Sequence, residues 1–206
     1  MKILLLHAIA FAIHRTSLLA LDAAVHKLAK RWPPLPTTAT KPHSMRDKVY
    51  LAINSIMEHA FLFGLLSLDY AQPSLLTVVH FYGLFWLDDI LYSALHRALH
   101  TRHLYRAVHA HHHAERCPKR GYADAGNEHP VEQVLALGAH FLLLRTYRFD
   151  FVAVAAHLGV KAVGSCCNHV DYAVHVPLGF GVAIDTAYHR EHHQRHRCNY
   201  AQFVSL

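Results

Sequence analysis

Charged residues are scarce in this chain: only 17% of its 206 residues are Asp, Glu, Lys or Arg, whereas 53% are hydrophobic. This composition excludes a disordered chain, which combines few apolar residues with high charge. Acidic residues are the scarcer sign, 14 against 20 basic ones, so the net charge is +6 with histidine counted as neutral. A basic and apolar chain indicates either nucleic acid or an anionic membrane surface as partner.

Cysteine is also rare, and the sequence contains no C-x-x-C pair. The four cysteines, Cys117, Cys166, Cys167 and Cys198, match neither a disulfide framework nor a zinc knuckle. We expect them to be reduced thiols that face a reducing compartment or lie in the core.

Long apolar stretches are abundant, and the first covers residues 4–21. It opens like a signal sequence, but His14 and Arg15 interrupt it and no small-residue cleavage site follows. A proline-rich segment, residues 30–44, comes next and excludes a continuing helix. Residues 1–44 are therefore expected to form an amino-terminal anchor or interfacial helix followed by a linker.

Four further apolar stretches predict two helical hairpins in residues 45–206. The first pairs residues 49–68 with a helix that starts at residue 75, and the second pairs residues 131–144 with residues 149–167. Glu58 and His59 lie inside the first stretch and must face the bundle interior if that helix crosses a bilayer. We therefore predict an all-α integral membrane helical bundle with about four membrane helices, the second hairpin being alternatively re-entrant or interfacial.

Basic residues gather before the first hairpin and around two histidine-rich segments, and the positive-inside rule places all three clusters on the cytosolic face. Arg145 and Arg148, in the turn of the second hairpin, oppose this orientation. Topology already explains the basic residues and no binding module is recognisable, so we expect no nucleic-acid partner.

The histidine-rich segments contain three boxes with helical spacing. "HRALH" places His96 and His100 one turn apart, and "HAHHH" and "HREHH" each offer three histidines at i, i+3 and i+4 on one expected helix face. The boxed histidines of these two are His109, His112 and His113, and His189, His192 and His193.

Eight imidazoles exceed the four ligands of a tetrahedral zinc site, so the boxes predict a cytosolic di-metal site. Imidazole also suits iron, copper and nickel, so ligand type does not choose the metal. A nitrogen-rich pair of ions beside a bilayer favours redox activation of dioxygen. The alternatives are a solvated histidine-rich loop, a membrane protein that binds metal without turnover, and a membrane zinc hydrolase.

The boxes and their surroundings resemble a known family. "LDDILYSALHRALH", "LYRAVHAHHH", "NEHPVE", "NHVDYAVHVP" and "TAYHREHHQRHRCNYAQF" are similar to segments of the fatty acid hydroxylase/sterol desaturase superfamily, over about residues 75–203. Members are integral-membrane di-iron oxygenases that hydroxylate or desaturate lipid chains or sterols.

The resemblance implies which residues hold the two iron ions. They are His96, His100, His109, His112, His113, His169, His189, His192 and His193. His175 is a possible substitute for a further histidine of the family. His129 is expected either to support the ligands or to cap a helix before Pro130, and Asp88 or Asp89 either to orient a ligand or to cap a helix.

The resemblance also implies the partners of the reaction. Dioxygen and two electrons are expected, the electrons coming from NAD(P)H through a separate reductase and a cytochrome b5-type carrier. The expected substrate is a membrane lipid, fatty acyl chain or sterol, and the expected location is the endoplasmic reticulum with the metal site facing the cytosol.

Overall fold

The computed structural model describes residues 2–39 and 41–203, with side chains from Leu5 onward. Most of these residues are helical, and a short antiparallel sheet lies near the carboxyl end. The elements are α1 (Lys2–Ala29), α2 (Met45–Leu65), α3 (Thr77–Leu99), α4 (Arg102–Ala107), the 3₁₀ helix η1 (His109–Ala114), α5 (Tyr122–Ala125), α6 (Pro130–Thr146), α7 (Phe151–Cys167), β1 (His175–Gly179), β2 (Val182–Asp185) and α8 (Thr186–Arg195).

Side-chain caps fix the starts of several helices. Ser44 begins α2 with a capping box, because its hydroxyl accepts from the backbone N–H of Asp47 while the Asp47 carboxylate accepts from the backbone N–H of Ser44. Asp150 caps α7 and Asp185 caps α8 by accepting backbone N–H groups. These short-range bonds explain why the helices follow the predicted apolar stretches so closely.

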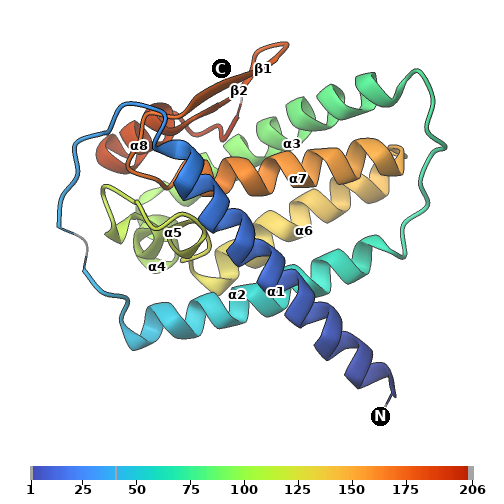
Figure 1. The fold of residues 1–206 in the computed structure, drawn as a ribbon, viewed down its shortest axis with the longest axis horizontal. Helices are drawn as coiled ribbons and strands as arrows, with labels where there is room; N and C mark the ends of the chain where they lie inside the picture. The colour runs from blue at the N-terminus through green and yellow to red at the C-terminus, as the bar shows by residue number, and fades with distance from the viewer. Residues whose placement is uncertain (1, 40, 204–206) are drawn as a thin grey trace.

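Four long helices, α2, α3, α6 and α7, lie side by side, and α1 crosses them diagonally with its amino end beyond the bundle (Figure 1). One apolar cluster joins α1, α3, α7 and the sheet around Phe85, Cys166 and Val170. A second joins α2, α3, α6 and α7 around Leu84, Leu144 and Val154. The two predicted hairpins therefore pack as one bundle.

Only α1, over Leu5–Ala29, is long and apolar enough to cross a membrane among the described helices, and 6% of its most apolar window is buried. Four membrane helices are thus not established. α2 and α3 contain charged residues that an apolar membrane span lacks. α6 and α7 have 17 residues each, fewer than the roughly 20 that cross a bilayer.

The sheet is a departure from the all-α expectation. β1 and β2 pair antiparallel, with His175 opposite Asp185. Gly179, Phe180 and Gly181 all have positive φ at the turn, a conformation that glycine adopts without steric cost. Pro177 and these glycines, which break any helix here, allow a hairpin instead.

The segment after α8 folds back against α3 and α7. The Asp89 carboxylate accepts from the backbone N–H groups of Gln202 (2.8 Å) and Phe203 (3.1 Å). The Phe203 ring lies against Gly164, where a Cβ atom would overlap it. This segment thereby covers the carboxyl end of α3, where two of the predicted ligands lie.

Candidate metal centre

All nine histidines predicted as ligands lie at the end of the bundle where α3 ends and α8 lies. They form two groups, in each of which the candidate ligand atoms lie within 4.8 Å of one another. The first histidine group contains His96, His100, His109, His113 and His192, and the second contains His112, His169, His189 and His193. Segments up to about a hundred residues apart in sequence thus converge.

Each of the two three-histidine boxes contributes ligands to both groups. Histidines four residues apart stay together, as His109 and His113 do in the first group and His189 and His193 in the second. The histidine at i+3 of each box belongs to the other group: His112 is in the second group and His192 is in the first. Consecutive residues point about 100–120° apart on a helical turn, so each box reaches both groups. The sequence predicted that the three histidines of a box act from one helix face, whereas in the structure each box is divided between the two groups.

In the first group the Nε2 atoms face one another. His109 Nε2 lies 3.0 Å from the Nε2 atoms of His96, His100 and His113. His192 Nε2 lies 3.2 Å from that of His100 and 3.1 Å from that of His113. Neighbouring ligand atoms of an ion at about 2.1 Å lie about 3.0 Å apart in octahedral and about 3.4 Å apart in tetrahedral geometry. The spacing fits one ion with more than four ligand positions.

Hydrogen bonds on the opposite ring atoms fix two of these Nε2 atoms, those of His96 and His192, as acceptors. The Nδ1 of His96 lies 2.9 Å from the carbonyl oxygen of Tyr200, and that of His192 lies 2.7 Å from the carbonyl oxygen of Cys198. A carbonyl accepts only, so the proton sits on Nδ1 and a lone pair on Nε2. Lone pairs 3 Å apart repel unless a cation lies between them, which makes the donor set suitable for a metal ion.

The second group follows the same rule. His189 Nε2 lies 3.3 Å from His169 Nε2 and 3.2 Å from His193 Nε2. The Nδ1 of His169 lies 2.8 Å from the carbonyl oxygen of Ser165, and that of His193 lies 3.1 Å from that of Glu115. His112, the fourth member, is in ring contact with His193. This group also fits one cation.

Burial keeps these imidazoles neutral. Burial first, then the nearby His169 and His192, lower the pKa of His112 to about 3. Burial and His196 lower the pKa of His192 to about 4, and burial with His192 lowers that of His100 to about 3. Neutral imidazole is the form that binds metal, so the site is ready for ligation at neutral pH.

Glu132 is a functional residue that the sequence analysis missed. Its Oε1 lies 2.7 Å from the Nδ1 of His109, and both side chains are buried. A carboxylate on the far nitrogen of a ligand histidine fixes its tautomer and raises its basicity. The signal was present in "NEHPVE", the motif that holds both Glu132 and His129.

The other candidates lie outside both groups. His129 caps α6 by accepting from the Val131 N–H, the second of the two roles considered for it. His175 is exposed and pairs with Asp185 at 3.0 Å. Neither Asp88 nor Asp89 bonds a ligand histidine in any described contact, since Asp89 bonds the carboxyl-terminal segment and Asp88 belongs to a separate network.

That network contains Asp88, His140, His157 and Lys161, between α3, α6 and α7. Asp88 lies 2.6 Å from His140 Nδ1 and 2.5 Å from the ammonium of Lys161. A lysine already neutralises the carboxylate, so an additional cation does not fit here. We interpret this network as a buried ion pair of the bundle.

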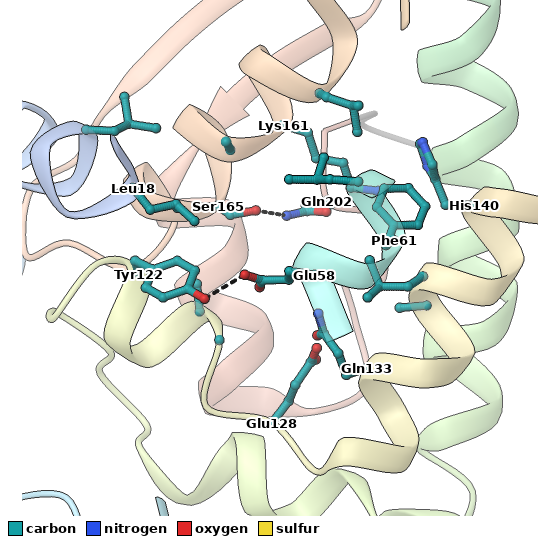
Figure 2. A pocket seen from close by; sticks show the side chains of 18 of the residues that line it. Leu18, Glu58, Phe61, Tyr122, Glu128, Gln133, His140, Lys161, Ser165 and Gln202 are labelled. Carbon is teal, nitrogen blue, oxygen red and sulfur yellow. Dashed lines mark hydrogen bonds between the residues drawn. The ribbon is translucent and has the colours of Figure 1, made fainter. Parts of the chain in front are cut away.

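The second histidine group lies between two cavities of different character. A cavity of about 470 Å³ between α1, α2, α6 and α7, whose surface is mostly apolar, reaches His112, His169 and His189. Part of its lining is drawn in Figure 2. A smaller cavity of about 210 Å³ reaches His112 and His193 from the linker side.

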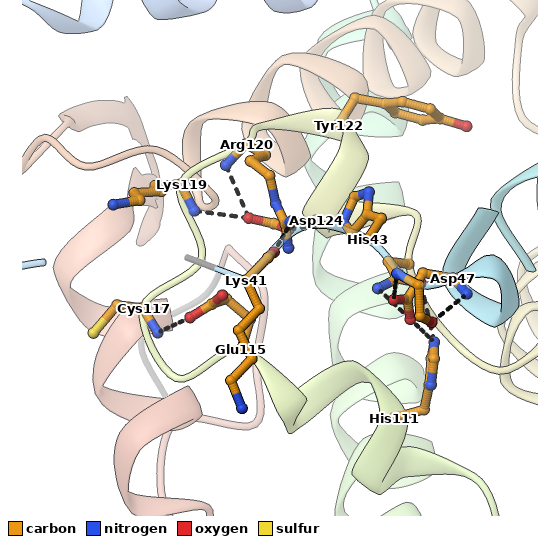
Figure 3. Close-up of polar contacts among 12 residues, drawn as sticks. Lys41, His43, Asp47, His111, Glu115, Cys117, Lys119, Arg120, Tyr122 and Asp124 are labelled. Atoms are coloured by element: carbon orange, nitrogen blue, oxygen red, sulfur yellow. Dashed lines mark hydrogen bonds and ion pairs between the residues drawn. The ribbon is translucent and has the colours of Figure 1, made fainter. Parts of the chain in front are cut away.

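The smaller cavity is polar. Asp124 accepts from the backbone N–H of Lys119 and from the side chain of Arg120, and Asp47 pairs with His111 (Figure 3). One side of the second group is thus apolar and suited to a hydrocarbon, and the other carries the charged groups that water and protons require.

Comparison with known families gives one match. A sequence model described as fatty acid hydroxylase matches residues 81–206, which includes every histidine of both groups. No curated protein and no solved structure matches the chain.

Proposed function

The chain belongs to the fatty acid hydroxylase family, and on that premise we propose that it is a membrane di-iron oxygenase. It uses dioxygen and two electrons to hydroxylate an unactivated C–H position of a membrane lipid, a fatty acyl chain or a sterol. The overall reaction consumes the C–H bond, dioxygen, two electrons and two protons, and yields a hydroxyl group and water. Desaturation at the same site is the alternative outcome.

One observation carries this proposal: two all-histidine groups draw on the same boxes, and the second group lies at the wall of a cavity whose surface is mostly apolar. A hydrolytic zinc site uses fewer histidines and a nearby carboxylate base. Here the one carboxylate that contacts a histidine of either group, among the described residues, is Glu132, and it contacts the ring on the side away from the converging Nε2 atoms. This donor set favours a redox role.

The protein's own part is to hold and shield the site. The nine histidines would bind the two iron ions, and bound iron supplies the activation of dioxygen. Glu132 and the carbonyl groups of Tyr200, Cys198 and Ser165 keep the Nε2 atoms free for the metals. The larger cavity excludes bulk water from the carbon that reacts, and the polar cavity delivers protons from the other side.

Membrane attachment is part of the proposal. α1 is apolar over Leu5–Ala29, and the outer faces of the bundle expose large apolar side chains such as Val79, Ile90 and Leu142. Exposed apolar surface of this kind marks contact with lipid. We place the bundle in the endoplasmic reticulum membrane, with both histidine groups on the cytosolic side.

The proposed electron source is a separate protein, because the family premise implies NAD(P)H, a reductase and a cytochrome b5-type carrier. Basic side chains around η1 and α8, among them Arg97, Arg116 and Arg195, suit an acidic carrier or anionic headgroups.

The test is lipid oxidation by the full chain in membranes. Membranes with the protein, NAD(P)H and a reductase system are exposed to isotopically labelled dioxygen, and lipids are analysed by mass spectrometry. We expect labelled hydroxylated lipid only when iron, dioxygen and reductant are all present. His112→Ala and His192→Ala should abolish it while membrane insertion persists, and His7→Ala should be silent.

Two results would overturn the proposal. Iron-loaded protein that gives no oxidised lipid with any membrane extract would indicate a metal-binding relative without turnover. Product formation without dioxygen or reductant would indicate a hydrolase.

A further inference from the structure

The apolar cavity contains a polar end that neither the histidine groups nor the bundle core requires. Glu58 of α2, Glu128 of the α5–α6 loop and Gln133 of α6 all line it, and Figure 2 shows their side chains gathered on one side of the cavity. Three polar side chains in a mainly apolar cavity are costly unless they hydrogen-bond to something.

Two of the three have no such partner in the described part of the chain. Glu58 Oε2 accepts from the Tyr122 hydroxyl at 2.7 Å. The Glu128 carboxyl and the Gln133 side-chain amide make no hydrogen bond or ion pair among the described residues, although Gln133 is only 6% exposed. A buried amide that is aimed into a cavity without a partner indicates a bound polar group, because such groups are nearly always satisfied.

The charges of the cavity disfavour an anion. Its one ammonium group, Lys161, lies 2.5 Å from the Asp88 carboxylate and is already neutralised. Arg15 donates to the Tyr122 hydroxyl at 2.9 Å and is not part of the cavity lining. A carboxylate ligand would find no unpaired arginine or lysine among the described residues that line the cavity, whereas carboxylate sites normally present one.

The donor and acceptor pattern favours a hydroxyl group. Gln133 can donate through its amide N–H, and the carboxyl of Glu128 can accept. A hydroxyl both accepts and donates, whereas an ammonium only donates and a carboxylate only accepts. Burial, and then the neighbouring Glu58 charge, raise the pKa of Glu128 to about 8, so this carboxyl brings no full negative charge at neutral pH.

We propose that this cavity selects lipids with an uncharged hydroxyl group, which Glu128 and Gln133 hold while the hydrocarbon extends along the apolar wall towards His112, His169 and His189. This inference rests on the proposed function, because it names the class of substrate for the same site. Phe61, Leu137 and Leu158 supply the apolar wall. Free fatty acids are then poor ligands, and alcohols are good ones.

Binding without turnover tests this proposal separately from catalysis. The full chain in detergent, without reductant, is titrated at neutral pH with hexadecanol, its methyl ether, palmitate and hexadecylamine. We expect hexadecanol to bind roughly tenfold more tightly than the ether, the size of one satisfied buried hydrogen bond, and more tightly than the acid or the amine.

Two variants assign the selectivity to these residues. Glu128→Leu should reduce hexadecanol binding about tenfold, to the level of the ether, while binding of the ether is unchanged, and Gln133→Leu should weaken both ligands because the ether oxygen also accepts from the Gln133 amide. Asp69→Leu, the same kind of change at an exposed carboxylate, should have no effect. The ether reports whether Glu128→Leu still folds around the cavity.

Tighter binding of palmitate or hexadecylamine than of hexadecanol would overturn the proposal, as would unchanged selectivity in Glu128→Leu. Selective alcohol binding without any lipid oxidation would instead refute the oxygenase function and leave the inference intact. Oxidation of fatty acids with no preference for alcohols would refute the inference and leave the oxygenase function intact.

Discussion

The carboxylate of Glu132 lies 2.7 Å from the Nδ1 of His109, with both side chains buried in the interior beside the first histidine group. His109 in turn is the imidazole whose Nε2 lies 3.0 Å from three others, so Glu132 supports the centre of that group. Backbone carbonyl groups contact the Nδ1 atoms of four other ligand histidines, His96, His169, His192 and His193. A carboxyl group on the far nitrogen fixes the tautomer and orientation of a ligand histidine.

Replacing Glu132 therefore tests how the first group is supported. Glu132→Gln keeps the size and an acceptor oxygen but replaces the carboxyl group with an amide, and we expect a loss of metal affinity of about 10–100-fold. Titration of the metal-free protein with iron or zinc measures it. Glu191→Gln, at an exposed residue that pairs with Arg195 on α8, should leave the affinity unchanged. Equal affinities in both variants would contradict a role for Glu132.

His192 and His193 are consecutive but belong to different groups, so their single variants should remove different ions. His192→Ala should weaken the ion of the first group and His193→Ala that of the second, each lowering the bound metal from two equivalents towards one. Metal analysis together with spectra of the cobalt-substituted protein distinguishes the two remaining sites. His103→Ala, at an exposed position, serves as the control. Identical spectra for the two ligand variants would argue against the assignment of His192 and His193 to different ions.

Gly164 is predicted to tolerate no side chain. In Gly164→Ala the new Cβ would overlap the Phe203 ring, so the carboxyl-terminal segment must shift at a cost of about 1–3 kcal/mol. Because Tyr200 in this segment bonds His96, metal affinity of the first group should fall together with thermal stability. Gly138→Ala, where no atom lies within 4 Å of the added methyl, should be neutral or slightly stabilising. Gly164→Ala with unchanged stability would refute this packing.

Removing the metal should destabilise the whole bundle. Without a cation the converging Nε2 lone pairs of the ligand histidines repel one another, and a ligand present at about a thousand times its Kd contributes about 4 kcal/mol to stability. For a chain of this size we expect chelation to lower the Tm by roughly ten degrees. Differential scanning fluorimetry in detergent, with and without chelator, measures this. Readdition of iron should restore the Tm, and an unchanged Tm would indicate that the groups stay empty.

The sequence predicted the long helices because apolar periodicity and helix caps are local signals, and the nine histidines that the boxes and the family resemblance pointed to do converge in two groups. Apolar runs that follow N-caps such as Ser44 and Asp150 locate the long helices, with ends that differ from the predicted ones by a few residues or, for α1, by eight. The hairpin at Gly179 and Gly181 is not among the predicted elements, because two short strands carry little periodic signal. The pairing of the strands depends on tertiary contacts that no local pattern contains.

The division of the histidines into groups could not be predicted from spacing. An i, i+3, i+4 pattern shows which residues lie near one face, but whether His112 follows His109 depends on the 3₁₀ geometry of η1 and on where α8 packs. Glu132 lies 23 residues from His109, and only the packing of α6 brings them together. The role proposed for Glu128 and Gln133 likewise cannot be predicted from the sequence, because the cavity that they line forms only through tertiary packing.

The crossing of His112 and His192 between the two groups has a consequence for assembly. Each of the peptide segments η1 and α8 is tied to both ion positions, so capture of the first ion orders the backbone that presents ligands to the second. We expect cooperative loading, with singly occupied protein scarce at every iron concentration.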